Sequence, residues 1–277
     1  MSGVGAPRNV VPRVRDYRFG RSTAPNRWWL DGDPIATAIF DGLSATFPHG
    51  ERFFMDSLRR YRDAVPDDLR DQITIFITQE AMHTREHVAF NNSIAIHGRD
   101  FDALNARSEA VVSLARMERP LDQLAATAAL EHFTAVLGHV VLANPRYLKG
   151  ANAEIARLWR WHSLEEIEHK AVAFDTLIHV LRPAPAWRRW LFRSGAMFKM
   201  TRLFTGPSLG NITQILRDDG VSKSQTYLGL IHYLLISPGL LWQAAPLCLA
   251  YYLPGFHPWK LDDSQLLIQA DHDLATG

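Results

Sequence analysis

Two stretches decide the fold: QEAMHTREHVAFN at residues 79–91 and WHSLEEIEHKAVAFD at residues 161–175. Each contains a Glu-x-x-His pair, Glu80 with His83 in the first and Glu166 with His169 in the second. Residues three apart share one face of a helix, so both side chains of a pair can reach the same metal ion. Two such pairs on separate long helices predict a site for two metal ions inside a helical bundle.

Two single glutamates, Glu51 and Glu131, fall on two further predicted helices. A bundle site of this kind takes one Glu from each of two helices and a Glu-x-x-His from each of the other two. Four buried carboxylates need two divalent cations, because burial without them would cost several kcal/mol each. Apolar residues flank the proposed ligands at helical spacing and predict that these glutamates are buried: Ile73, Phe76, Phe90, Leu124 and Ala128.

Two more histidines lie on the same helix faces. His162 precedes Glu166 by four residues and His87 follows His83 by four, so either can add an imidazole to the site. For His87 the alternative is a place behind the ligands or on the surface. The competing interpretation of the whole pattern is that the glutamates are solvated and the histidines are ordinary core or surface residues. Four residues lie off the apolar stripes and are expected outside the ligand set: Glu86, Glu165, Glu168 and His132.

The remaining sequence predicts an all-α fold, because it shows no β-alternation and its proline and glycine residues bound helical segments. Helices are expected from about 48 to 61, 67 to 98, 102 to 118, 120 to 143 and 152 to 181. The predicted organisation is an extended arm at 1–30 and a metal-binding bundle at 31–182. A basic, aromatic and hydrophobic helical appendage follows at 183–260, and a tail at 261–277.

Composition excludes several classes of protein. The 277 residues carry a net charge of +1, which gives no field for nucleic acid. The single cysteine, Cys248, excludes an internal disulfide and a cysteine-based zinc site. Residues 1–30 contain no apolar run that would act as a signal peptide, so a cytoplasmic location is expected. A homodimer is left open.

The appendage indicates an apolar partner. No Asp, Glu, Lys or Arg occurs in the 36 residues from Ser224 to Trp259, but prolines interrupt this stretch and favour two short helices over one straight span. The segment 182–204 before it is basic and rich in Trp and Phe, as in helices that bind at lipid surfaces. A peripheral position on the inner face of the membrane is one prediction. Packing on the bundle, or over an apolar substrate tunnel, is the other.

The same two stretches carry a family resemblance that covers about residues 10–260. They resemble the bacterial group labelled predicted metal-dependent hydrolases. The ligand order is also similar to the ferritin-like di-iron carboxylate proteins, and the His162–Glu166–His169 spacing to the arylamine N-oxygenases. This resemblance implies a ferritin-like four-helix bundle with seven ligands, a set that His87 does not match: Glu51, Glu80, His83, Glu131, His162, Glu166 and His169.

Imidazole and carboxylate ligands without thiolate suit iron, manganese or zinc. The main hypothesis is two iron ions and an oxygenase or oxidase that uses O2 and an electron donor on an apolar or lipid-like substrate, because an apolar site keeps water from the oxidant. The first alternative is a dinuclear hydrolase of an ester or phosphoester. The second is a non-catalytic metal-binding or interaction protein. No catalytic residue beyond the ligands and no organic cofactor is expected.

Overall fold

The computed structural model describes residues 10, 12–19 and 25–276 of the chain. Within these ranges every regular element is a helix, and the one β-type contact is an isolated bridge between Leu30 and Ala151. The predicted all-α class is therefore confirmed. Of the expected N-terminal arm, residues 1–9, 11 and 20–24 lie outside the described residues, and 12–19 form no helix or strand.

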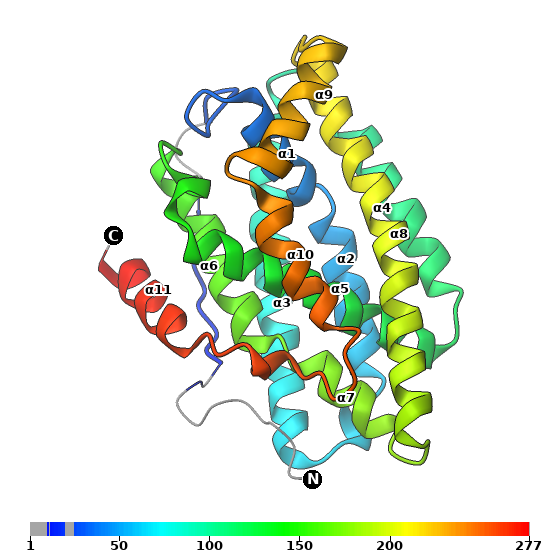
Figure 1. Cartoon of the computed structure of the whole chain (residues 1–277). Coiled ribbons are helices and arrows are strands. Elements are labelled where there is room, and N and C mark those ends of the chain that lie inside the picture. Colours follow the sequence, from blue (N-terminus) through cyan, green and yellow to red (C-terminus); the bar gives the residue numbers. More distant parts are fainter. Residues whose placement is uncertain (1–9, 11, 20–24, 277) are drawn as a thin grey trace.

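Four helices form the bundle: α2 (Phe47–Arg59), α3 (Asp67–Ala95), α5 (Pro120–Ala143) and α6 (Ala153–His169). Helix α2 packs against α3 and α5, and α6 packs against the same two helices, so the four close a ring (Figure 1). Local sequence sets where they begin. Pro48 and Pro120 stand in first turns, where the missing N–H costs nothing. Asn152 caps α6 by accepting from the N–H groups of Glu154 and Ile155.

The helix expected over residues 152–181 is wrong as a single element. It is two helices, α6 and α7 (Val172–Val180), separated at Lys170 and Ala171 directly after His169. Neither proline nor glycine marks the break. The ammonium group of Lys170 instead reaches the C-terminal segment, where it donates to Asp263 Oδ2 at 2.5 Å and to the Leu261 carbonyl at 2.8 Å. Tertiary contacts thus accompany a helix break that the local sequence does not predict.

The other elements surround the bundle (Figure 1). The longer ones are α1 (Pro34–Ser44), α4 (Phe101–Arg116), α8 (Ala186–Asp218), α9 (Lys223–Ile231), α10 (Leu240–Ala250) and α11 (Ser264–Thr276). Helix α8 packs on α1, α4 and α5, α10 packs on α5, and α11 packs on α6. The short ones are η1 (Arg62–Ala64), η2 (Pro145–Leu148), the π-helical η3 (His232–Ile236) and η4 (Pro258–Lys260).

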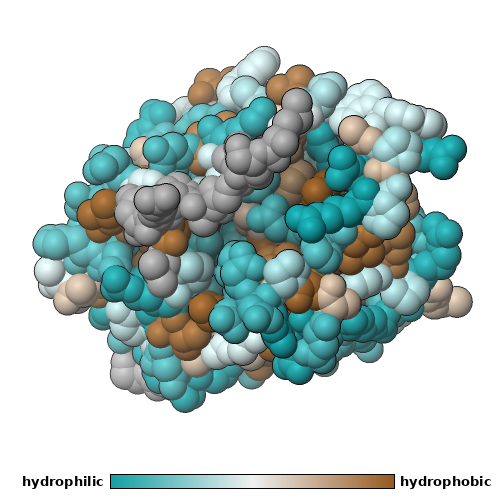
Figure 2. All heavy atoms as spheres, turned by 90° about the horizontal axis from the view of Figure 1, so that it is seen from below, coloured by the Kyte–Doolittle hydropathy of each residue, from teal (hydrophilic) through white to brown (hydrophobic). Residues whose placement is uncertain are grey.

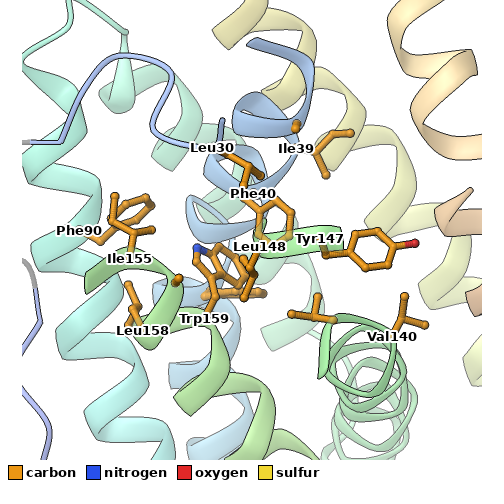
Figure 3. Packing of buried hydrophobic residues seen from close by; sticks show 14 of the residues in the cluster. Leu30, Ile39, Phe40, Phe90, Val140, Tyr147, Leu148, Ile155, Leu158 and Trp159 are labelled. Atoms are coloured by element: carbon orange, nitrogen blue, oxygen red, sulfur yellow. The ribbon is translucent and has the colours of Figure 1, made fainter. Parts of the chain in front are cut away.

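The apolar core of the described residues consists of two clusters, and each of them contacts a predicted ligand. Figure 3 shows part of the first, where Trp159 of α6 meets Phe40 of α1 edge-to-face with ring centroids 4.7 Å apart. Phe47 of this first cluster stacks on His162 at 4.7 Å. Phe76 of the second cluster lies 4.7 Å from the ring of His169. Buried apolar side chains of both clusters therefore contact the predicted ligands, and an uncompensated charge is costly in such surroundings.

By length and composition, one helix of the described residues could cross a membrane. A bent pair of helices would be a second candidate if the pair is counted as one span. The single helix is α5, and 78% of its apolar window is buried in the bundle, as for a core helix. The bent pair is α9 with η3 and α10, whose axes differ by 58°. The face seen from below in Figure 2 is mostly hydrophilic with separate hydrophobic patches.

Helices α5 and α6 approach closely at Gly138, and this contact gives a stability prediction. A Cβ on Gly138 would lie 2.8 Å from the Ser163 carbonyl oxygen and 3.2 Å from Ser163 Cα, and backbone cannot rotate away. We expect Gly138→Ala to lower the free energy of unfolding by about 1–3 kcal/mol. Gly195→Ala on α8 is the control, because no described atom beyond its own stretch of helix lies within 4 Å of the position that its Cβ would take. It should gain up to about 1 kcal/mol from helix propensity. Urea denaturation measures both, and equal effects would contradict the close approach.

Candidate metal centre

All seven predicted ligands lie together in the middle of the bundle, in two neighbouring groups. The donor atoms within each group lie within 4.8 Å of one another. Every one of these side chains is buried, with at most 4% of any residue exposed. The first group comes from α2, α3 and α6 and the second from α3, α5 and α6: Glu51, His83 and His162, then Glu80, Glu131, Glu166 and His169.

Two carboxylates connect the groups. Glu80 has Oε2 3.8 Å from His83 Nδ1 and Oε1 3.2 Å from His169 Nε2, so each oxygen faces a different group. Glu166 Oε1 lies 3.4 Å from His83 Nδ1 and 3.5 Å from His169 Nε2. Two ligands of one ion, each bonded at about 2.0–2.2 Å, stand about 3 Å apart. These distances would let the first group hold one ion and the second group another, with Glu80 and Glu166 close to histidines of both groups.

Buried atoms without hydrogen-bond partners test whether the residues fit metal ions. Such atoms are costly in a folded protein and call for an explanation. In the described part of the chain, eight of them belong to this cluster, on all four glutamates and on the donor nitrogens of two histidines: Glu51 Oε1, both oxygens of Glu80 and of Glu131, Glu166 Oε2, His83 Nδ1 and His169 Nε2. Cations at the two groups would satisfy all of them. The residues fit two metal ions.

The electrostatics of the cluster lead to the same conclusion. Burial raises the pKa of Glu51 and of Glu131 well above the usual range, and neighbouring carboxylates raise both further. Burial also acts to raise the pKa of Glu166, but the adjacent His169 and His83 bring it well below the usual range. The imidazoles alone thus compensate one carboxylate. Divalent cations would favour the ionised form of the rest.

Each imidazole of the cluster is oriented from behind by a polar partner, as is usual for metal-ligating histidines. His83 Nε2 lies 3.1 Å from Glu165 Oε2. His169 Nδ1 lies 3.2 Å from the amide oxygen of Gln79, whose own N–H groups donate to Arg13 O and Glu168 Oε2. His162 Nδ1 lies 2.9 Å from His87 Nε2. The structure therefore places His87, the additional candidate ligand, behind His162 and outside both groups.

The acidic residues expected outside the ligand set are buried rather than solvated. Glu165 is fully buried, and Glu168 is 7% exposed. Arg15 bridges them, with its guanidinium 3.4 Å from Glu165 Oε1 and 2.8 Å from Glu168 Oε1. Sequence reasoning missed Arg15 and Gln79 because their partners lie far along the chain. The four consecutive residues Glu165–Glu168 include three glutamates without a lysine, which was the available signal that some face inward.

A cavity of about 80 Å³ leads to the cluster from the side of α8. Its lining includes Glu51 and Glu166, one residue from each donor group. Leu203 also lines it and is 36% exposed, so the cavity extends toward the surface of α8. The remaining lining is mostly apolar and aromatic, from α2, α4, α5 and α8: Phe47, Phe54, Val111, Val112, Leu130, Phe133, Met200, Phe204 and Pro207.

Paired groups of buried carboxylates and imidazoles on four helices define a metal-dependent protein of the helical-bundle class. The chain belongs to the family described as "Predicted metal-dependent hydrolase", which matches residues 13–262. No curated protein and no solved structure matches the chain. Metal dependence therefore rests on the family and, independently, on the two buried groups. The family description agrees with the hydrolase alternative rather than with the oxygenase hypothesis.

Proposed function

We propose that the protein is a dinuclear metal enzyme that oxidises an apolar small molecule with O2. The observation that carries this is the cavity, because its mostly apolar lining ends on one carboxylate from each donor group. Two ferrous ions at these groups, with an external electron donor, would supply the electrons that O2 activation requires. A substrate in the cavity would lie beside both ion positions.

The residues that line the cavity would bind the substrate, orient it and keep water away from it. Phe54, Phe133 and Phe204 offer flat apolar surfaces, which exclude water from the inner end. The hydroxyl groups of Thr46, Ser108 and Thr134 donate to carbonyls of nearby backbone, at 2.7 to 3.4 Å. Ser208 differs, because its buried hydroxyl group has no hydrogen-bond partner within residues 10, 12–19 and 25–276. This hydroxyl is suited to hold a polar end of the substrate away from the metals.

Hydrolysis is the second candidate, and the family description favours it. Metal ions at the two groups would then supply hydroxide at neutral pH. An ester or phosphoester with apolar substituents would enter the same cavity. The lining of the cavity argues against hydrolysis. Apart from Ser208, the threonine and serine hydroxyl groups just named donate to backbone carbonyls, and among the described residues no histidine or lysine lines the cavity.

Metal content and gas consumption separate the two reactions. For oxidation we expect two iron ions per chain in protein isolated without added metal, and O2 uptake when the anaerobically reduced protein meets air-saturated buffer. For hydrolysis we expect the zinc form to cleave apolar nitrophenyl esters or phosphoesters in the absence of O2. Zinc-supported turnover under strict anaerobiosis, with no O2 uptake by the iron form, would reject the oxidase proposal.

Exposed apolar side chains on α8 and between residues 227 and 253 support a lipid-like substrate taken up at a membrane. Nine large apolar side chains are exposed between residues 227 and 253, in a stretch without charged residues. Leu191, Phe198 and Leu203 are exposed on α8, which also carries Arg188, Arg189 and Arg202. Apolar side chains beside cations suit a bilayer with anionic headgroups. The nine are Tyr227, Leu228, Ile231, Leu235, Ile236, Leu241, Trp242, Leu249 and Leu253.

Vesicle flotation tests this part of the proposal. We expect the protein to float with vesicles that contain phosphatidylglycerol and to stay behind with pure phosphatidylcholine at physiological salt. Trp242 is 70% exposed, and Trp242→Glu should reduce flotation several-fold because it places a charge in the apolar face. Ile268→Glu on α11, at a site 56% exposed, is the control and should float as wild type. Equal flotation of the two variants would contradict a lipid contact through α9–α10.

A further inference from the structure

A buried chain of hydrogen bonds runs away from the metal centre behind His162. It passes from His162 Nδ1 to His87 Nε2 at 2.9 Å and from His87 Nδ1 to Ser44 Oγ at 2.8 Å. It ends at Asn91 Oδ1, 2.6 Å from Ser44 Oγ. All four side chains are at most 5% exposed, so water does not compete for these bonds. The chain joins α1, α3 and α6.

The far end of this chain fixes its direction. Asn91 Nδ2 donates to the backbone carbonyl of Ser44 at 3.1 Å. A carbonyl can only accept, so the amide of Asn91 has one orientation, with its oxygen toward the Ser44 hydroxyl. That amide oxygen can also only accept. The hydroxyl proton of Ser44 is therefore committed to Asn91.

The donor and acceptor roles of both imidazoles follow from this assignment. Because Ser44 has given its only proton to Asn91, its Oγ must accept from His87, which places the His87 proton on Nδ1. A neutral imidazole carries one N–H, so His87 Nε2 accepts from His162. The proton of His162 is thus on Nδ1. Its Nε2 is left with a lone pair toward the centre, where Glu166 Oε1 lies 3.4 Å away.

We propose that Asn91, Ser44 and His87 are positioning residues that hold His162 in the tautomer able to bind metal through Nε2. The inference rests on the metal centre of the proposed function and not on which reaction it performs. Phe47 stacks on the His162 ring at 17° and fixes its plane, so the tautomer is what remains to be set. In the other tautomer, His162 Nε2–H would point at Glu166 and block an ion. The hydrogen-bond chain removes that competing state.

The tautomers can be read without metal or turnover. In metal-free protein labelled with 15N-histidine, ring-nitrogen NMR shifts should show Nδ1–H for His87 and His162. His83 should differ and carry a proton on Nε2, whether or not its Nδ1 is also protonated, because its Nε2 faces Glu165. Ser44→Ala should mix the tautomers of both His87 and His162, since it removes the acceptor. Wild-type His162 with its proton on Nε2 would overturn the proposal.

Metal affinity supplies the second readout. In Zn²⁺ titrations against a chromophoric chelator, Ser44→Ala should weaken one of the two ions about 10–100-fold, as loss of an orienting partner does elsewhere. Ser57→Ala is the matched control. Ser57 is buried to the same degree, but its hydroxyl group bonds that of Thr127 at 2.7 Å and takes no part in the hydrogen-bond chain behind His162. Ser44→Thr keeps the hydroxyl and should restore affinity. If Ser44→Ala and Ser57→Ala behave alike in both readouts, the proposal fails. If wild type binds no metal but the tautomers hold, the proposed function fails instead.

Discussion

Glu131→Gln should leave the protein with one tightly bound metal ion in place of two and should abolish turnover. Glu131 Oε2 lies 3.3 Å from His169 Nε2, and neither oxygen of Glu131 has a hydrogen-bond partner among the residues that the structure describes. The variant keeps the volume of the side chain but removes one negative charge from the second donor group. If that ion then binds about 100-fold more weakly, the stabilisation by saturating metal falls by about 2.7 kcal/mol. Elemental analysis and thermal unfolding with and without metal measure both effects.

In the absence of metal, the same substitution should not lower the free energy of unfolding, and this contrast with the metal-bound protein makes the prediction specific. Burial and the neighbouring Glu166 and Glu80 raise the pKa of Glu131, so the carboxylate is unfavourable there without a cation. Glu131→Gln should therefore leave the metal-free protein as stable as wild type or more so. Glu109→Gln on the exposed face of α4 is the control and should change nothing. A Glu131→Gln protein with two metals and full activity would show that the assignment of the bundle is wrong.

Arg99→Met should cost about 3–5 kcal/mol of unfolding free energy, the largest stability effect we expect away from the metals. The guanidinium of Arg99 is fully buried and lies 2.5 Å from Asp41 Oδ2 and 2.7 Å from Asp219 Oδ2. It also donates to the Arg27 carbonyl at 2.9 Å. Methionine fills similar space but leaves two buried carboxylates without this partner. Urea denaturation measures the loss.

Surface and rescue variants complete the test. Arg116→Met removes an exposed pair with Asp56 at 3.5 Å and should stay within about 0.5 kcal/mol of wild type. Adding Asp41→Asn to Arg99→Met should recover part of the loss, because one buried charge is gone. A loss below about 1 kcal/mol for Arg99→Met would contradict the role of this ion-pair network.

Asp41 also predicts a pH dependence. Burial raises its pKa to about 7, although Arg99 opposes the shift. The folded state then keeps a proton that the unfolded state, with an ordinary pKa of 3.8, releases. Stability from this group is present below pH 3.8 and declines as pH rises toward 7. Asp41→Asn should flatten the difference in unfolding free energy between pH 4 and pH 7. An unchanged slope would contradict the shift.

The ligand arrangement was accessible from sequence because helical geometry is local. The spacing of Glu80 to His83 and of Glu166 to His169 fixes which side chains share a face, and the order of the single glutamates fixes which helices must meet. The structure brings all seven candidates together. The partners behind them were not accessible. Glu165 meets a residue 82 positions away, and Ser44 meets one 43 positions away. No local pattern encodes such pairs.

The helix boundaries likewise separate into those that the local sequence predicts and those that depend on distant contacts. Pro120 and the apolar spacing after it predict α5 from 120 to 143, and the structure has these bounds. The break after His169 was not predicted, because it involves Lys170 contacting Asp263 and lacks a proline or glycine. The hydrophobic stretch after Lys223 was expected as two short helices, and α9 and α10 are such helices. Whether this appendage touches lipid remains a proposal for flotation to decide.

Residues 12–19 lie where they could affect the rate of metal exchange. Arg13 N–H donates to Glu168 Oε2 at 3.1 Å, Arg15 bridges Glu165 and Glu168, and Phe19 lies 5.4 Å from the ring of Trp161. This segment thus lies across the partners of His83 and His169. A metal ion that exchanges on this side of the bundle would require this segment to undock, whereas the cavity beside α8 is a separate route. We therefore expect that weakening the contacts of residues 12–19 speeds metal exchange more than it lowers the equilibrium affinity.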